Sequence, residues 1–390
     1  LVCFWGLDLL SPSELAPESF ADALEFFSDR LLVLVKRLAE QADRPHRLWF
    51  ITRGVCGADT ESEQVERASL LQSLVLGFAR SLREEQPHWS VRLIDIEGTP
   101  DLSAQQILAE SRSAESYDEV RWRGMERSAL ALEPCTLDSP GALERFEGSW
   151  LLSGGSGRLG LAMASRLVQR GVRHLLLIGR GEPNTDALER IAELRNLGAT
   201  VETRTVDVAD FIAVKELFDN LPPGWPALQG VIHAAGVLDD AVFHRYSAKR
   251  IAAVLAPKVS GGWNLHCLTK ALPIRHFLLI SSASGLLGNP GQAAYCAANS
   301  FLDALAVFRR GQGLPAQSQS WSAWADAADD PKVSQQLQRH GLAPVDPEQG
   351  LLALERALSL DVSHIALLPR NSVGRLIHPL FRSLEEVPST

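Results

Sequence analysis

Hydrophobic residues along the chain alternate between short runs of strand length and longer stretches with helical spacing. In the amino-terminal part, the runs Arg47–Thr52 and Val91–Ile96 predict buried strands, and Phe20–Glu40 and Glu66–Arg83 have the spacing of amphipathic helices. A further strand is predicted over Leu1–Leu7. Strands that alternate with helices are typical of a parallel sheet covered by helices, so we predict a doubly wound α/β unit here.

The same alternation repeats in the carboxyl-terminal part, with more elements. We predict strands at Trp150–Ser153, His174–Gly179, Thr200–Val206, Gly230–His233 and Arg275–Ser281, and helices at Leu159–Arg170, Asp186–Leu197, Phe211–Asn220 and Ala294–Arg310. The two parts are predicted to meet within Glu133–Glu147, which is interrupted by two prolines and a glycine. We therefore expect two parallel-sheet units, residues 1–146 and 147–390.

Composition is ordinary for a globular protein, with 46% hydrophobic and 22% charged residues among 390. No apolar run approaches the ~20 residues of a membrane-spanning helix. A net charge of −9 argues against nucleic-acid and anionic-membrane partners, which select basic surfaces. The five scattered cysteines form no CxxC pair, which disfavours disulfides and metal sites and favours a cytoplasmic location. The chain starts at Leu1 and not at Met, which suggests a piece of a longer polypeptide.

A glycine-rich turn lies between the first predicted strand and helix of the carboxyl-terminal part. Its motif residues are Gly155, Ser156, Gly157, Leu159 and Gly160. In a dinucleotide-binding turn such glycines permit a tight bend, close approach of a pyrophosphate and close helix packing, and the helix start attracts the anion. A purely structural turn is the alternative. Arg53–Gly57, at the corresponding place in the amino-terminal part, lacks the pattern.

Residues after the next two predicted strands are candidates for cofactor contacts. Arg180 stands where an NAD enzyme would have an acidic residue, and a guanidinium can pair with a 2′-phosphate, which favours NADPH. An ordinary surface arginine is the alternative, and Glu182 lies nearby. Asp207 and Val208 are expected beside the adenine, with a helix N-cap as the alternative role of Asp207.

Polar groups that suit carbonyl reduction follow the predicted strand Arg275–Ser281. Ser282 comes directly after it, and Tyr295 and Asn299 share one face of the next helix. A phenol can donate a proton to a carbonyl oxygen while a serine hydroxyl stabilises its negative charge. The phenol needs a cation beside it, and Lys258, in an otherwise apolar stretch, is the candidate. The alternatives are a tyrosine packed in the core and a lysine that reaches the surface.

On these motifs the chain resembles ketoreductase domains of modular type I polyketide synthases, in the short-chain dehydrogenase/reductase superfamily, over essentially its whole length. The resemblance implies a truncated Rossmann-like first subdomain without cofactor and a catalytic subdomain that binds NADPH. It implies reduction of a β-ketoacyl thioester presented by an acyl carrier protein, among neighbouring domains of a multidomain synthase. A catalytically silent spacer and a free-standing dehydrogenase of small alcohols are the other hypotheses.

The resemblance also assigns roles. It implies that Tyr295 is the proton donor and Ser282 the oxyanion partner, with Lys258 and Asn299 exchanged relative to ordinary members of the superfamily. The turn that follows His233 is expected to pack beside the cofactor, and consists of Ala234, Ala235 and Gly236.

Further residues are expected to guide the substrate. They are Leu238, Asp239, Asp240, Leu287 and Pro290. The Leu-Asp-Asp sequence, which by itself predicts only a solvated loop, resembles the B-type signature that gives a D-configured β-hydroxyl. Leu287 stands where A-type ketoreductases have tryptophan, and Ala294 leaves epimerisation of the α-carbon open. Residues 322–345 resemble a lid over the substrate.

Overall fold

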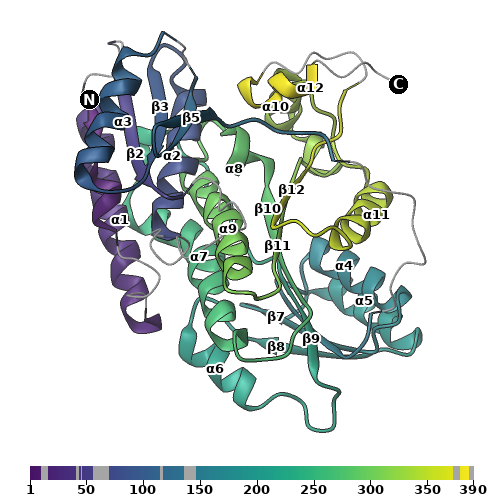
Figure 1. The fold of residues 1–390 in the computed structure, drawn as a ribbon. Coiled ribbons are helices and arrows are strands. Elements are labelled where there is room, and N and C mark those ends of the chain that lie inside the picture. Colours follow the sequence, from purple (N-terminus) through teal and green to yellow (C-terminus); the bar gives the residue numbers. More distant parts are fainter. Residues whose placement is uncertain are drawn as a thin grey trace.

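The structure, a computed structural model, describes residues 1–9, 16–40, 44, 46–55, 70–114, 117–135, 146–371 and 378–385. The chain forms two sheets with helices packed around them (Figure 1). The smaller sheet consists of β1 Val2–Cys3, β2 Arg47–Arg53, β3 Ser90–Ile96, β4 Glu119–Arg123 and β5 Glu126–Ala129. The larger sheet consists of β6 Ser149–Ser153, β7 His174–Gly179, β8 Thr200–Thr205, β9 Leu228–His233, β10 His276–Ser282, β11 Gln317–Trp321 and β12 His364–Leu367.

Helices connect these strands and cover both sheets. Those associated with the smaller sheet are α1 Pro17–Ala39, α2 Ser73–Glu85 and α3 Pro100–Arg112. The others are α4 Arg158–Gln169, α5 Thr185–Asn196, α6 Phe211–Asp219, α7 Ala248–Thr269, α8 Ala283–Leu287, α9 Ala293–Gly311, α10 Pro331–His340, α11 Pro347–Leu358 and α12 Arg382–Glu385. None of the helices in the described part of the chain is both long and apolar enough to cross a membrane.

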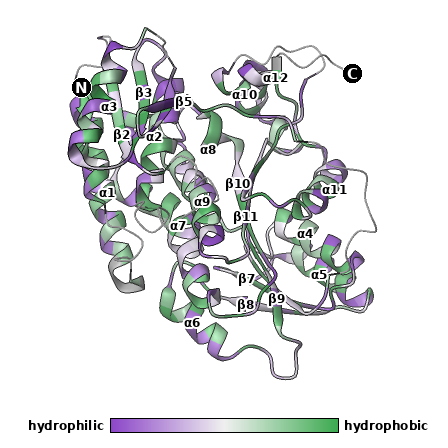
Figure 2. Cartoon of the chain, in the orientation of Figure 1, coloured by the Kyte–Doolittle hydropathy of each residue, from purple (hydrophilic) through white to green (hydrophobic). Residues whose placement is uncertain are grey.

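The larger sheet is parallel throughout, in the order β12-β11-β10-β9-β6-β7-β8. The direction of winding reverses between β6 and β9, where ligands bind in open α/β sheets. All residues of β6 are buried, as expected for a strand covered on both faces. Figure 2 shows hydrophilic and hydrophobic bands alternating on the outer helices α5 and α6. The predicted α/β fold with a parallel sheet is confirmed here.

The smaller sheet runs in sequential order, so it lacks the reversal of a doubly wound sheet. Its first four strands are parallel, as predicted, but β5 pairs antiparallel with β4. This hairpin was not predicted; it turns at Gly124, whose φ of 54° favours glycine. The predicted strand Leu1–Leu7 was wrong beyond Cys3, because the chain bends into a 3₁₀ turn, Trp5–Asp8, after two residues pair with β2.

Helix α2 joins the two halves of the molecule. It was predicted as Glu66–Arg83, of which the first four residues lie outside the described part; a 3₁₀ turn precedes its start at Ser73. Its Gly77 touches α9 so closely that an added Cβ would lie 2.2 Å from the Cys296 carbonyl oxygen. Most of Glu133–Glu147, the predicted boundary, also lies outside the described residues.

Candidate active site

A cavity of about 480 Å³ opens at the carboxyl ends of β9, β10 and β11. Its wall includes three of the predicted catalytic residues, Lys258, Ser282 and Tyr295. They come from α7, the end of β10 and α9, and the fold brings them together although they lie far apart in the sequence. The ammonium nitrogen of Lys258 lies 5.5 Å from the centre of the Tyr295 ring.

Lys258 is buried, with only 4% of its surface exposed, which excludes the alternative of a lysine that reaches solvent. Its Nζ donates a hydrogen bond to the backbone carbonyl of Ile280, at 2.8 Å. Burial lowers the pKa of Lys258 to about 8, while the negative charge of Asp303 acts in the opposite direction. The ammonium group is therefore poised to titrate just above neutral pH.

Tyr295 is half-buried and lines the cavity. Burial raises the pKa of its phenol, and hydrogen bonding with Asn299 and Ser282 only partly offsets that effect. Lys258, the cation predicted beside this phenol, has its ammonium directed to the Ile280 carbonyl, and the net direction of the phenol's pKa is upward. A raised pKa keeps the phenol protonated at neutral pH, which is the form that a proton donor needs.

The serine and the asparagine each retain hydrogen-bonding capacity. Ser282 Oγ accepts from the backbone N–H and the hydroxyl of Ser284, at 3.2 and 3.0 Å, which leaves its own proton to donate to the Tyr295 phenol or to a carbonyl oxygen. Asn299 is buried one helical turn after Tyr295 and donates to that residue's carbonyl, at 2.8 Å. Its Oδ1 is buried without a hydrogen-bond partner among the described residues. Such an atom is costly unless a ligand or water satisfies it.

The glycine turn follows β6 and begins α4, as predicted. An added Cβ at Gly160 would lie 2.3 Å from the Gly154 carbonyl oxygen, and one at Gly155 would lie 2.7 Å from the Leu152 carbonyl oxygen. Gly157 is the N-cap of α4 and offers no side chain to its first-turn N–H groups. This bare backbone cradle fits a dinucleotide pyrophosphate. The intervening Ser156 is half-buried.

The turn after β9 packs against the glycine turn and the lysine. The Ala234 N–H donates to the Ser153 carbonyl, at 3.0 Å, and an added Cβ at Gly154 would lie 2.9 Å from Ala234 and Ala235 backbone atoms. An added Cβ at Gly236 would lie 3.0 Å from Lys258 Cε. The predicted cofactor turn and catalytic lysine are thus neighbours.

The remaining candidate cofactor residues lie beyond the cavity wall. Arg180 is exposed after β7 and makes no hydrogen bond or ion pair with any residue that the structure describes. Glu182 instead accepts from the Thr205 hydroxyl, at 2.6 Å. Asp207 is not the cap of α6, because Asp210 holds that position; Asp207 accepts locally from the Ala209 N–H.

Val208 is a buried core residue, and its carbonyl accepts from the side-chain amide of Asn264 on α7, at 3.0 Å. This bond holds the loop that follows β8 against α7, the helix that carries Lys258.

The predicted substrate-guiding residues divide into two groups. Leu238 and Leu287 line the cavity, whereas Asp239, Asp240 and Pro290 do not. Asp239 pairs with Arg250, which lowers its pKa, and Asp240 accepts from the Gln292 amide, at 3.1 Å. The two aspartates therefore shape their loop and do not face the cavity.

The segment 322–345 covers one side of the cavity, where the lid was predicted. Helix α10 contributes apolar and polar groups to the wall, and Trp324 stacks on Trp321, with ring centres 5.1 Å apart. Cavity residues from this segment are Ser322, Ala323, Trp324, Ala327, Val333, Gln336, Leu337, His340 and Leu342.

Sequence reasoning missed several residues of the site. Gln292, the N-cap residue of α9, lines the cavity three positions before Tyr295, and this proximity in the sequence could have identified it. His340 lines the cavity from α10, and burial lowers its pKa to about 4, so it is neutral at physiological pH. No sequence signal points to His340 or to Asp303.

Comparisons with known proteins agree with this geometry. The family described as "KR domain" matches residues 148–326. Among solved structures, A-type ketoreductases from a modular polyketide synthase share 34% identity, covering 87% of this chain and 72% of that one, with a TM-score of 0.77. The ketoreductase from the first module of phoslactomycin biosynthesis in Streptomyces sp. HK803 shares 31% identity, covering 91% and 84%, with a TM-score of 0.78.

The curated relatives are far longer than this chain. The polyketide synthase GfsE of Streptomyces halstedii is 36% identical over 377 residues, which is 93% of this chain and 10% of that protein. The chain thus spans about a tenth of the length of such relatives. KR domains are oxidoreductases that reduce β-keto groups and in general use NAD(P)H. From the site geometry and these likenesses together, the chain belongs to the ketoreductase domains of modular polyketide synthases.

Proposed function

We propose that this chain reduces the β-keto group of an acyl thioester to a D-configured β-hydroxyl, with NADPH as reductant. The observation that carries the proposal is the convergence of Lys258, Ser282 and Tyr295 on one cavity beside the glycine turn. Carbonyl reduction needs a proton donor, an oxyanion partner and a reductant site in one place. A silent spacer would need none of these groups to meet.

Four residues have separate roles in the proposed reduction. Tyr295 donates its phenolic proton to the carbonyl oxygen, and Ser282 donates a hydrogen bond to the same oxygen. The cation of Lys258 stabilises the negative charge left on the phenol. Asn299 orients this arrangement through the Tyr295 carbonyl, and its unsatisfied Oδ1 can accept from a hydroxyl or water that returns the proton.

The groups that would hold the cofactor are those of the glycine turn and its neighbours. The backbone of Gly155–Gly160 would hold the pyrophosphate, Arg180 the 2′-phosphate, and Asp207 and Val208 the adenine side. The turn Ala234–Gly236 would lie beside the ring. NADPH, when bound, supplies the hydride for the carbonyl carbon.

Cofactor preference is expected to depend on Arg180. Because its guanidinium is exposed and unpaired among the described residues, Arg180→Ala should leave the fold intact. It should raise KM for NADPH by about tenfold or more, since a charge-assisted hydrogen bond to the phosphate is lost, and leave KM for NADH little changed. Steady-state kinetics with both cofactors measure this, with exposed Arg190→Ala on α5 as the matched control. An equal change for both cofactors would contradict the assignment.

The proposed D configuration of the product is argued from this chain's own residues, because the solved relatives include both A-type and C2-type enzymes. Leu238 from the Leu-Asp-Asp loop and Leu287 both line the cavity. With NADPH and a racemic α-methyl β-ketoacyl thioester, we expect a D-configured β-hydroxyl product, identified by chiral chromatography. An L-configured product would overturn the B-type assignment, and the α-epimers recovered report whether the enzyme selects at the α-carbon.

The physiological substrate is proposed to be a thioester on the phosphopantetheine arm of an acyl carrier protein, within a multidomain synthase. The cavity has apolar walls along α10 and α8 that suit an acyl chain, including Leu287, Val333 and Leu337. Residues 1–146 are proposed as a structural subdomain without cofactor, and 147–390 as the catalytic subdomain with its lid at 322–345.

A further inference from the structure

Helix α2 of the smaller half lies directly against the catalytic helix α9. The first ten residues of α2 are all buried, and Gly77 allows its backbone to touch that of α9 next to Tyr295. The polar side chains at the end of this helix point toward the segment that follows Ser282. The smaller half thus reaches the wall of the cavity.

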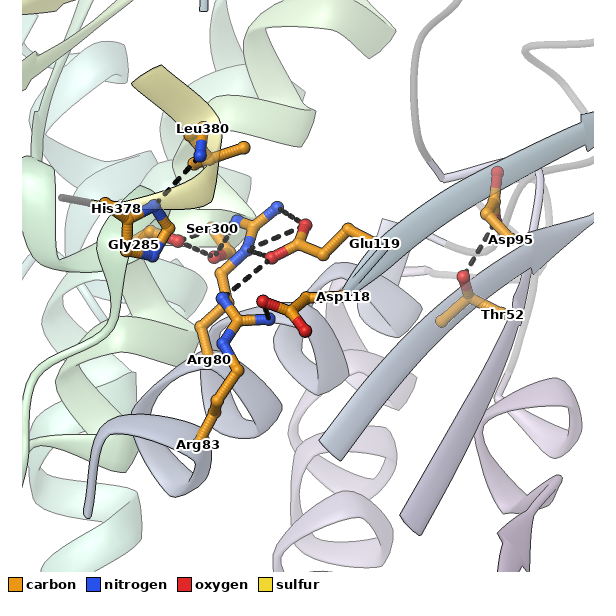
Figure 3. A network of polar contacts seen from close by, with 10 residues as sticks. All are labelled: Thr52, Arg80, Arg83, Asp95, Asp118, Glu119, Gly285, Ser300, His378 and Leu380. Carbon is orange, nitrogen blue, oxygen red and sulfur yellow. Dashed lines mark hydrogen bonds and ion pairs between the residues drawn. The ribbon is translucent and has the colours of Figure 1, made fainter. Parts of the chain in front are cut away.

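Two α2 side chains hold this segment. Arg80 Nη1 donates to the Gly285 carbonyl, at 2.7 Å, and Ser81 Oγ donates to the Asn289 carbonyl, at 2.5 Å. Figure 3 shows Arg80 between Gly285 and Glu119, whose carboxylate accepts from Arg80 Nε and Nη2, at 2.9 and 2.7 Å. Since both ion-pair partners are buried, with side chains only 5% exposed, the guanidinium has a fixed position.

Glu85, the last residue of α2, joins two loops with one carboxylate. One oxygen accepts from the Phe243 N–H, at 2.8 Å, and the other accepts from the Gly291 N–H, at 3.0 Å. The loops also meet directly, because the Ala241 N–H donates to the Gly291 carbonyl, at 2.8 Å. The first loop carries Leu238 and the second Asn289, and both of these residues line the cavity.

We infer that Glu85 is a positioning residue for the substrate: it fixes the spacing of the loops 238–243 and 288–292, and so determines which face of the ketone meets the reductant. This inference rests on the proposed function. An ionised carboxylate is the group that can accept from two backbone N–H donors at once. No neutral side chain of the same size offers two equivalent acceptor oxygens, because the amide of glutamine replaces one of them with a donor.

The test compares Glu85→Gln with Glu84→Gln. Glu84 is the neighbouring half-buried residue, and it has no hydrogen bond to either loop among the described residues. In Glu85→Gln one N–H loses its acceptor. We expect the fraction of the minor β-hydroxyl stereoisomer to rise about tenfold, the factor for one lost hydrogen bond. KM for the thioester should rise, while kcat and NADPH binding change little. Glu84→Gln should match the wild type.

A second readout does not depend on turnover. Amide hydrogen exchange should accelerate in Glu85→Gln at peptides covering 240–243 and 288–292 and remain unchanged at α4 and β6. If the wild type reduces no thioester, the proposed function fails, while exchange still reports whether Glu85 couples the loops. Unchanged exchange and an unchanged stereoisomer ratio would overturn the inference.

A third variant covers the case in which Glu85→Gln does not fold. Glu85→Asp keeps the charge but shortens the side chain, so that it cannot span both donors, and the same change in stereoisomer ratio is expected. If both variants unfold while Glu84→Gln does not, Glu85 maintains the fold and not the loop spacing, and the inference is wrong.

Discussion

Tyr295→Phe is expected to abolish turnover of a β-ketoacyl thioester while NADPH still binds. The substitution removes only the phenolic oxygen from a half-buried ring, so the cavity and the glycine turn should persist. Loss of a general acid lowers rates by roughly 10²–10⁴-fold. The measurements are NADPH consumption with the thioester and the change in NADPH fluorescence on binding.

The matched control is Tyr117→Phe. The Tyr117 ring lies between Arg127 and Arg382, outside the cavity, and keeps these contacts without its hydroxyl. It should reduce the thioester at the wild-type rate. Full activity in Tyr295→Phe would refute the assignment of the proton donor, and loss of NADPH binding would show that the variant disturbs the cofactor site instead.

Activity should fall as pH rises through about 8, because Lys258 then loses its proton. Well above that pH, kcat/KM should drop about tenfold per pH unit, as for a single ionisation. Lys258→Met should be at least ~10²-fold less active at neutral pH, a typical effect of losing a group that supports proton transfer, and its residual rate should lack this limb. The control is Lys249→Met, an exposed lysine at the start of the same helix.

Raising the pH above about 8 should increase the stability of the fold while it lowers activity. The folded-state pKa of Lys258, about 8, lies below its ordinary value of 10.5. Between these two pH values the unfolded chain binds more protons, so this lysine's contribution to the free energy of unfolding increases with pH. Urea unfolding should therefore find Lys258→Met more stable than the wild type at neutral pH, with a smaller difference in alkaline buffer. A difference independent of pH would contradict the lowered pKa.

Local patterns in the sequence were sufficient for most of the larger sheet. The runs that predicted β6, β7 and β9 are apolar because both faces of these strands are covered, and the glycine turn after β6 needs backbone space that only glycine leaves. The pairing of Tyr295 with Asn299 follows from helical spacing alone. The strand at the edge of the smaller sheet was harder to predict. β5 is a largely exposed strand of four residues, and its sequence has no alternation of buried and exposed positions.

Two features were decided by the tertiary structure alone. They are the electrostatics of the site and the contacts that the smaller half makes with the loops around the cavity. The sequence placed Lys258 in an apolar stretch, but only packing against β10 directs its ammonium to the Ile280 carbonyl and lowers its pKa. Glu85 looks like any charged residue at a helix end, and its two acceptor bonds exist because loops from the other half arrive there. Residue type and short-range spacing can be read directly from the sequence. Desolvation and long-range contacts depend on every element that packs around a group.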